Sequence, residues 1–196
     1  MALKDYYAGT VVLLDAEFTC WSDSLASGWS DPKHPAEIIE IGMIAYDASR
    51  QIETTSFTSL VKPLVNPVLS DYCLNLLPIV QTEVDSAPEY ESVMSDVSDW
   101  LKQHTAPNSP TAAWGKIDRS HTTNQSKRHS VSDPFGIRPH IQVDELVKDA
   151  LDIETQIERE DVRTRLNIES ITGRHRALSD SADLIAFDLA LDRINK

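Results

Sequence analysis

The chain has 196 residues, of which 41% are hydrophobic and 25% are charged, an ordinary composition for a globular protein. Its apolar runs are far shorter than the about 20 residues that a membrane-spanning helix needs, and two cysteines cannot form a disulfide framework. A net charge of −13 argues against nonspecific phosphate contacts made by Lys and Arg. The length is that of a single domain, which we expect to span residues 1–196. The start of the chain has no signal-peptide pattern and cysteines are few, so we expect a cytoplasmic protein without a membrane partner.

Strands are expected in the first third of the chain. Residues 10–17 form an apolar run after Gly9, residues 37–47 are rich in isoleucine, and residues 51–61 are rich in Thr and Ser. The stretch 20–35 combines Ser, Asp, Gly and Pro, which is typical of a loop. The short connection between the second and third strands predicts an antiparallel meander.

Helices and short strands alternate in the remainder of the chain. The expected elements are short helical pieces within 71–84, an amphipathic helix from Pro88 to about Leu101, a strand at 111–114, a polar helix at 118–129, a strand at 140–143, a charged and at least partly helical stretch at 146–165, and a last helix at 176–194. This order predicts an α/β fold, in which a mixed five-stranded sheet has three antiparallel strands followed by parallel β-α units and is flanked by helices.

Two acids, Asp15 and Glu17, stand at the end of the first expected strand. Side chains alternate along a strand, so both carboxylates should face the same side. At a separation of about 4 Å and an effective dielectric near 20, their repulsion would be about 4 kcal/mol. A cation or a proton would remove that cost, and so would a strand end that already lies in solvent.

Three further polar residues lie at the ends of expected core elements. Asp180 takes an inward position in the last helix, which is costly unless the acid is paired or metal-bound, although the helix dipole also favours an acid there. Asp118 follows a strand and could be a helix N-cap. His175 is expected on a loop, where a neutral imidazole can accept a proton or simply be exposed. An oxygen-rich set of this kind suits Mg²⁺ or Mn²⁺.

Ordered motifs make the chain similar to a known family. The sequences are LDAEFTCW at 14–21 with EIIEIG at 37–42, WGKID at 114–118, and HRALSD at 175–180. They resemble the DEDD 3′-to-5′ exonucleases of ribonuclease-H-like fold, in the subgroup whose base is histidine (DEDDh). Residues 79–88 and 134–136 are similar to the branch that trims the 3′ ends of histone messages and small RNAs. The likeness covers about Val11 to Ala190.

The resemblance implies a site for two divalent ions, Mg²⁺ or Mn²⁺, about 4 Å apart. The residues that it assigns to these ions are Asp15, Glu17, Asp118 and Asp180. His175 would accept the proton of the attacking water. The substrate would be the 3′ end of single-stranded RNA, and the product a nucleoside 5′-monophosphate.

Substrate contacts are expected around these motifs, from Phe18, Thr19, Trp21, Lys116, Arg119 and Arg174. For the first three of these, loop packing is an equal alternative. The family usually has an acidic and aromatic pair where this chain has Lys116 and Ile117, and Ala where it has Ser181. Two other functions stay open, a proofreading-like exonuclease on DNA and a nucleic-acid-binding regulator without catalysis. The protein partner is left open.

Overall fold

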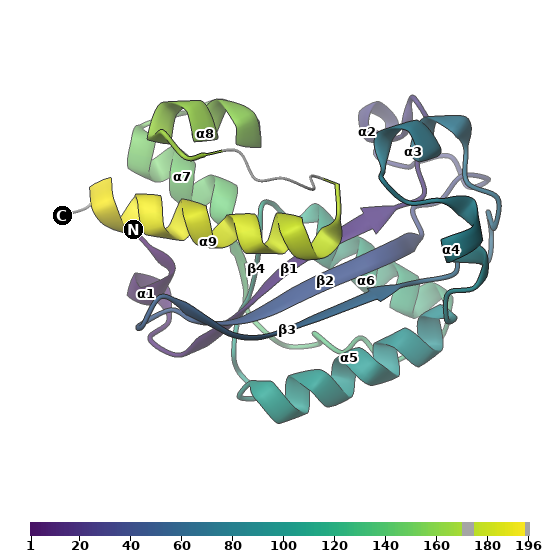
Figure 1. Ribbon diagram of the computed structural model, residues 1–196, viewed down its shortest axis with the longest axis horizontal. Coiled ribbons are helices and arrows are strands. Elements are labelled where there is room, and N and C mark those ends of the chain that lie inside the picture. Colours follow the sequence, from purple (N-terminus) through teal and green to yellow (C-terminus); the bar gives the residue numbers. More distant parts are fainter. Residues whose placement is uncertain (170–174, 195–196) are drawn as a thin grey trace.

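The computed structural model describes residues 1–169 and 175–194, and its centre is a five-stranded mixed sheet (Figure 1). The strands lie in the order β3-β2-β1-β4-β5. Their bounds are Thr10–Phe18 for β1, Ile38–Asp47 for β2, Ile52–Leu60 for β3, Thr111–Ala113 for β4 and His140–Gln142 for β5. The first three strands pair antiparallel, whereas β1–β4 and β4–β5 pair parallel. The predicted fold class is confirmed.

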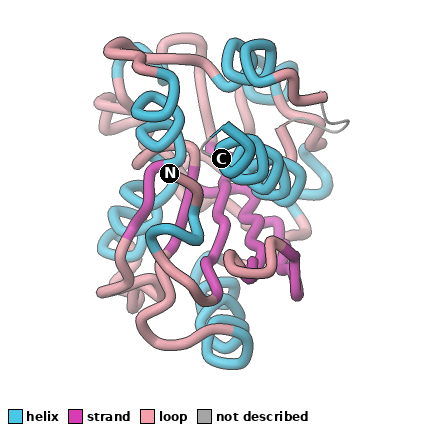
Figure 2. Tube along the Cα trace, turned by 90° about the vertical axis from the view of Figure 1, so that its left-hand side faces the viewer, coloured by secondary structure: helices cyan, strands magenta, loops and turns pink. Residues whose placement is uncertain are grey.

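Helices cover both faces of the sheet (Figures 1 and 2). Their bounds are Leu3–Tyr6 for α1, Ser24–Ser27 for α2, Asp71–Leu76 for α3, Gln81–Asp85 for α4, Tyr90–His104 for α5, Ile117–Arg128 for α6, Val143–Leu151 for α7, Arg159–Leu166 for α8 and Ala177–Ile194 for α9. The long helix α9 crosses one face over β1 and β2, and α5 lies under the other. Among the described residues, no helix has the length and apolarity needed to cross a membrane.

Alternation along β1 separates two hydrophobic cores. Val12 and Leu14 pack in the core that includes α5, whereas Val11 and Leu13 pack in the core that includes α9. All four side chains are fully buried. Because the period of a strand is two, the odd-numbered positions that follow Leu13 also face α9.

The structure adds two short helices to those expected from the sequence, and it shows which parts of one charged stretch are helical. The helices α1 and α2 were not expected, and α2 interrupts the predicted loop at 20–35. The stretch 146–165, expected to be at least partly helical, contains most of two helices, α7 and α8, with a non-helical connection between them. Asp152 ends α7 with a left-handed backbone (φ 55°), a conformation in which Asp is better tolerated than most residues.

The start of α9 lies unusually close to the sheet at Gly42. A Cβ at this position would lie 2.2 Å from the backbone nitrogen of Leu178, so only glycine permits the approach. The hydroxyl of the fully buried Ser181 donates a hydrogen bond to the carbonyl of Gly42, at 2.9 Å. The Ser that departs from the family pattern therefore joins α9 to β2.

Both cysteines are buried free thiols, Cys20 after β1 and Cys73 on α3. The cytoplasmic location drawn from the cysteine count stays a prediction.

Candidate active site

The end of β1 brings two carboxylates to the face that α9 covers. Asp15 and Glu17 continue the odd-numbered series of β1, and they are only 6% and 9% exposed. Asp15 pairs across the strands with Gly42, the residue on which α9 rests. The alternative that both acids are simply solvated at a strand end is excluded by their burial.

Asp118 reaches the same edge of the sheet from a different segment. β4 runs parallel to β1, with Val12 opposite Thr111, so the chain leaves both strands in the same direction. Pairing between the two strands stops at Leu13, and the backbone N–H of Ala16 instead donates to the Asp118 carboxylate, at 3.1 Å. This hydrogen bond holds the Asp118 carboxylate against the backbone of Ala16, the residue between Asp15 and Glu17 in the sequence.

Asp180 lies in the first turn of α9, and His175 lies two residues before the helix begins. The backbone N–H of His175 donates to the Asp180 carboxylate at 3.2 Å, and His175 has a left-handed backbone (φ 60°). The expected loop position of the histidine is thus observed. Glu40 accepts hydrogen bonds from the guanidinium of Arg176 and from the backbone N–H of Ala177, which fixes the start of the helix on β2.

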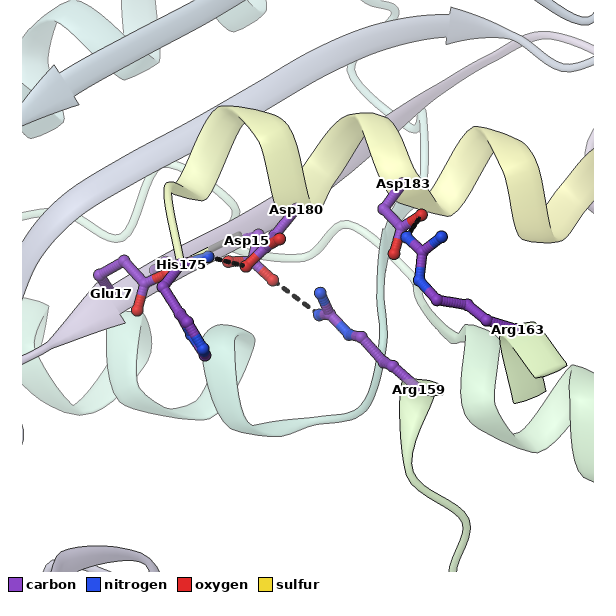
Figure 3. Close-up of a pocket in the computed structure, with 8 residues that line it drawn as sticks. Asp15, Glu17, Arg159, Arg163, His175, Asp180 and Asp183 are labelled. Carbon is purple, nitrogen blue, oxygen red and sulfur yellow. Dashed lines mark hydrogen bonds and ion pairs between the residues drawn. The ribbon is translucent and has the colours of Figure 1, made fainter. Parts of the chain in front are cut away.

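These residues converge on one cavity of about 220 Å³ (Figure 3). Its lining residues are Asp15, Ala16, Glu17, Arg159, Arg163, His175, Asp180 and Asp183. Potential ligand atoms of Glu17, His175 and Asp180 all lie within 4.8 Å of one another. Asp118 lies on the adjoining groove of about 500 Å³, which Asp15 and Arg159 also line. The five predicted catalytic residues therefore gather around Asp15.

The burial of these acids makes their charged forms costly. Burial, together with the nearby charges of Asp180, Glu40 and Asp118, raises the pKa of Glu17 to about 8. Burial also raises the pKa of Asp15 well above its usual range, although Arg159 opposes that change, and it raises the pKa of Asp118. A protein without bound cations would hold protons here, and a cation would favour their release.

The chemistry of the donor set fits hard divalent ions. Four carboxylates supply oxygen atoms, which Mg²⁺ and Mn²⁺ prefer as ligands. The raised pKa values of Asp15, Glu17 and Asp118 indicate that nearby positive charge does not offset the burial of these three acids. No Cys is among the residues that line the cavity. The residues present therefore fit a site for divalent ions better than a zinc site built on thiolates.

Three charged residues that line this cavity were not predicted from the sequence. Arg159 and Arg163 come from α8, and Asp183 comes from α9, one turn after Asp180. Arg159 donates to the Asp15 carboxylate at 2.7 Å, and Arg163 forms an ion pair with Asp183. Their segment alternates acids and bases, a pattern typical of a solvated helix, so periodicity alone carried no signal for either arginine.

The predicted substrate contacts of the first motif lie in two environments. Phe18 and Trp21 line a separate pocket of about 160 Å³, which also reaches Glu17. The Trp21 ring stacks on His34 with 4.2 Å between centroids, and Phe18 packs against Trp29. Thr19 is buried, and its hydroxyl donates to the carbonyl of Pro35 and accepts from the N–H of Glu37. Thr19 thus holds the loop in place.

The basic residues predicted to contact the substrate also lie in different environments. Lys116 is exposed and lines the groove next to Asp118. Arg119 instead pairs with Asp133 at 2.8 Å and donates to the carbonyl of Gly136, so its guanidinium holds the loop after α6. Arg174 lies outside the described residues.

The sequence is similar to known exonucleases. The model of the RNase T family, described as Exonuclease, matches residues 12–187. Similar curated proteins include ERI1 exoribonuclease 2 of Danio rerio (36% identical over 92 residues), the 3′-5′ exonuclease eri1 of Schizosaccharomyces pombe (34% over 95) and the human 3′-5′ exoribonuclease 1 (33% over 99). The matches cover 47%, 48% and 50% of this chain, but only 15%, 30% and 26% of those proteins.

Solved structures show the same fold over nearly the whole chain. A 3′-exonuclease that recognises the 3′ end of the histone mRNA stem-loop superimposes with a TM-score of 0.79, covering 95% of this chain and 65% of the other at 22% identity. The nuclease domain of 3′hExo, a DEDDh family member bound to rAMP, gives a TM-score of 0.78, covering 94% and 91% at 22% identity. The family match spans most of the sequence, and the fold agrees with it, so this chain belongs to the RNase T family of exonucleases.

Proposed function

We propose that the chain is a metal-dependent 3′-to-5′ exonuclease that removes nucleoside 5′-monophosphates from the 3′ end of single-stranded RNA. The observation that carries this proposal is the meeting of Asp15, Glu17, Asp118 and Asp180 beside His175, in a chain of the exonuclease family. The catalytic unit is taken to be one domain over residues 1–196.

In this proposal the four carboxylates hold two divalent ions, Mg²⁺ or Mn²⁺. Bound there, the ions would supply Lewis acidity, which lowers the pKa of a bound water and offsets the charge of the phosphodiester. The protein contributes the positions of the ligands, since Ala16 orients Asp118 and the backbone of His175 orients Asp180. Buried acids with raised pKa values are suited to this task, because a cation relieves the cost of their charge.

His175 is the proposed general base. Its imidazole lines the cavity next to Glu17 and Asp180 and can accept the proton of the attacking water. The left-handed backbone at His175 holds the residue outside α9, which leaves the ring free to face the cavity. Strain of this kind is often kept at functional sites.

The pocket of Phe18 and Trp21 is the proposed place for the terminal nucleoside. Glu17 lines both this pocket and the acidic cavity, so one nucleotide could place its phosphate at the acids and its base among the aromatic rings. Stacking of a base on an aromatic side chain is worth about 1–3 kcal/mol. RNA is the proposed substrate because the curated relatives named above include exoribonucleases.

A nuclease assay on 5′-labelled oligonucleotides tests the proposal. We expect a ladder of shortened RNA in Mg²⁺ or Mn²⁺, no ladder in EDTA, and no shortening when the 3′ end is blocked. Asp180→Asn should lower the rate by at least about 100-fold, and His175→Ala by about 10²–10⁴-fold with Mn²⁺ binding retained.

The matched control is Asp161→Asn on α8, where the acid is exposed and should tolerate the change. Internal cleavage, or activity that survives Asp180→Asn, would contradict the proposed site. DNA oligonucleotides of the same sequence test the choice of substrate independently of the site. Equal rates on DNA and RNA would overturn only the assignment of RNA as the substrate.

A further inference from the structure

The proposed metal chemistry does not use Arg159, a cation that lines the acidic cavity. It stands at N1 of α8 and extends its guanidinium into the cavity toward Asp15 (Figure 3). The cavity and the groove of Asp118 share two residues, Arg159 and Asp15. The guanidinium therefore lies where two hollows of the surface meet.

The other arginine of the cavity already has structural partners. Arg163 pairs with Asp183, donates to the carbonyl of Glu169 at 2.6 Å and lies over the ring of Phe187. Its side chain is only 4% exposed. Arg163 thus joins α8 to α9 and has little surface to offer a ligand.

Arg159 is held in place but keeps most of its donors. Its Nη2 donates to Asp15 Oδ1 at 2.7 Å, and its guanidinium lies over the ring of Trp114 at 5.6 Å. This is the single hydrogen bond that the group makes within residues 1–169 and 175–194, out of five N–H donors on a guanidinium. The side chain is 21% exposed, compared with 4% for Arg163.

A cation in this position suits a phosphate group. A planar guanidinium can present two parallel N–H donors to phosphate oxygens, and Asp15 and Trp114 limit its freedom before a ligand arrives. The acids that line the cavity, Asp15, Glu17, Asp180 and Asp183, offer no positive charge to the negatively charged end of a nucleic acid. Arg159 supplies a positive charge from the protein itself, which attracts a phosphate independently of bound ions.

We infer that Arg159 binds the phosphate of the 3′-terminal nucleotide, with its guanidinium held between Asp15 and Trp114. This inference rests on the proposed function and adds a phosphate-binding residue to it. Arg159 then contributes to the discrimination between a nucleotide and a nucleoside, whereas the aromatic pocket recognises what both ligands share.

Calorimetric titration with two ligands isolates this role. Adenosine 5′-monophosphate and adenosine are titrated into the full chain with Mn²⁺ at a concentration that saturates each variant. For Arg159→Gln we expect the Kd of the monophosphate to rise by about tenfold or more, with the Kd of adenosine unchanged. Arg159→Lys keeps the charge without the planar fork and should lie between Gln and the unaltered chain.

Arg165→Gln is the matched control, because Arg165 lies on α8, is exposed and lines neither hollow. The inference is overturned if Arg159→Gln leaves the Kd of the monophosphate unchanged, or weakens both ligands equally. It is also overturned if the variant changes only the affinity for Mn²⁺, since Arg159 would then be a counter-ion of Asp15.

Circular dichroism checks that the Gln variant is folded, and the Lys variant gives the decisive comparison if it is not. The activity of the unaltered chain on RNA distinguishes a failure of the proposed function from a failure of the role assigned to Arg159. A chain that releases no nucleotide from RNA would overturn the proposed function, whereas an active chain with equal phosphate affinity in Arg159→Gln would overturn only the role of Arg159.

Discussion

Gly42 determines how closely α9 approaches the sheet beside the candidate site. It lies opposite Asp15 in the strand pairing, and its missing side chain leaves room for the backbone of Ala177 and Leu178. The first turn of α9 carries Asp180 and follows His175. The absence of a Cβ at Gly42 therefore allows the start of α9, with Asp180, to lie close to the acids of β1.

Gly42→Ala should lower both stability and activity. The added Cβ would lie 2.2 Å from a backbone nitrogen, so α9 must move, at a cost of about 1–3 kcal/mol for an overpacked core. Urea unfolding and the nuclease assay measure the two effects. In the control Gly115→Ala, the nearest atom is 3.7 Å away, so stability should change little. A Gly42→Ala variant with unaltered stability and rate would show that the approach of α9 is not essential.

At the scale of elements, the sequence predicted the parts of the fold that follow simple periodicity. The apolar run of β1, the isoleucines of β2 and the amphipathic pattern of α5 were sufficient, because burial on a sheet or helix face imposes a period. The acids at 15, 17, 118 and 180 could be singled out because they interrupt or end such elements.

The charged contacts that the sequence does not reveal join segments that are distant along the chain. The charged sequence around Arg159 reads as a solvated surface, yet Asp15, 144 residues away, pairs with it. Asp183 and Asp188 on α9 are buried, the first against Arg163 and the second against Tyr46. Burial of a charge is decided by such partners, and local periodicity carries no information about them.

At the scale of the whole molecule, Asp188 joins three parts of the chain. It is fully buried in α9, accepts the backbone N–H of Leu3 at 2.6 Å and accepts the hydroxyl of Tyr46 on β2 at 2.7 Å. Burial raises the pKa of Asp188, although both hydrogen bonds oppose this. The folded state therefore binds a proton that the unfolded state releases at lower pH.

The sign of the resulting pH dependence follows from this raised pKa. As the pH rises above about 4, the unfolded chain loses its proton first, so the contribution of Asp188 to stability decreases until the folded form also ionises. Asp188→Asn removes the titration, and its free energy of unfolding should fall less steeply with pH. Urea unfolding in EDTA from pH 4 to about 7 measures this, with the exposed Asp149→Asn as control. Parallel curves for Asp188→Asn and the unaltered chain would contradict it.

Asp118 comes from a segment distant from β1, so its substitution shows whether acids from distant segments form one catalytic site. Asp118→Asn keeps an oxygen that can accept the N–H of Ala16, so the fold should persist while a negative ligand is lost. The measurement is the rate of nucleoside 5′-monophosphate release from RNA with a free 3′ end in Mn²⁺. We predict a loss of at least about 100-fold in the folded variant. An unaltered rate in Asp118→Asn would contradict the account.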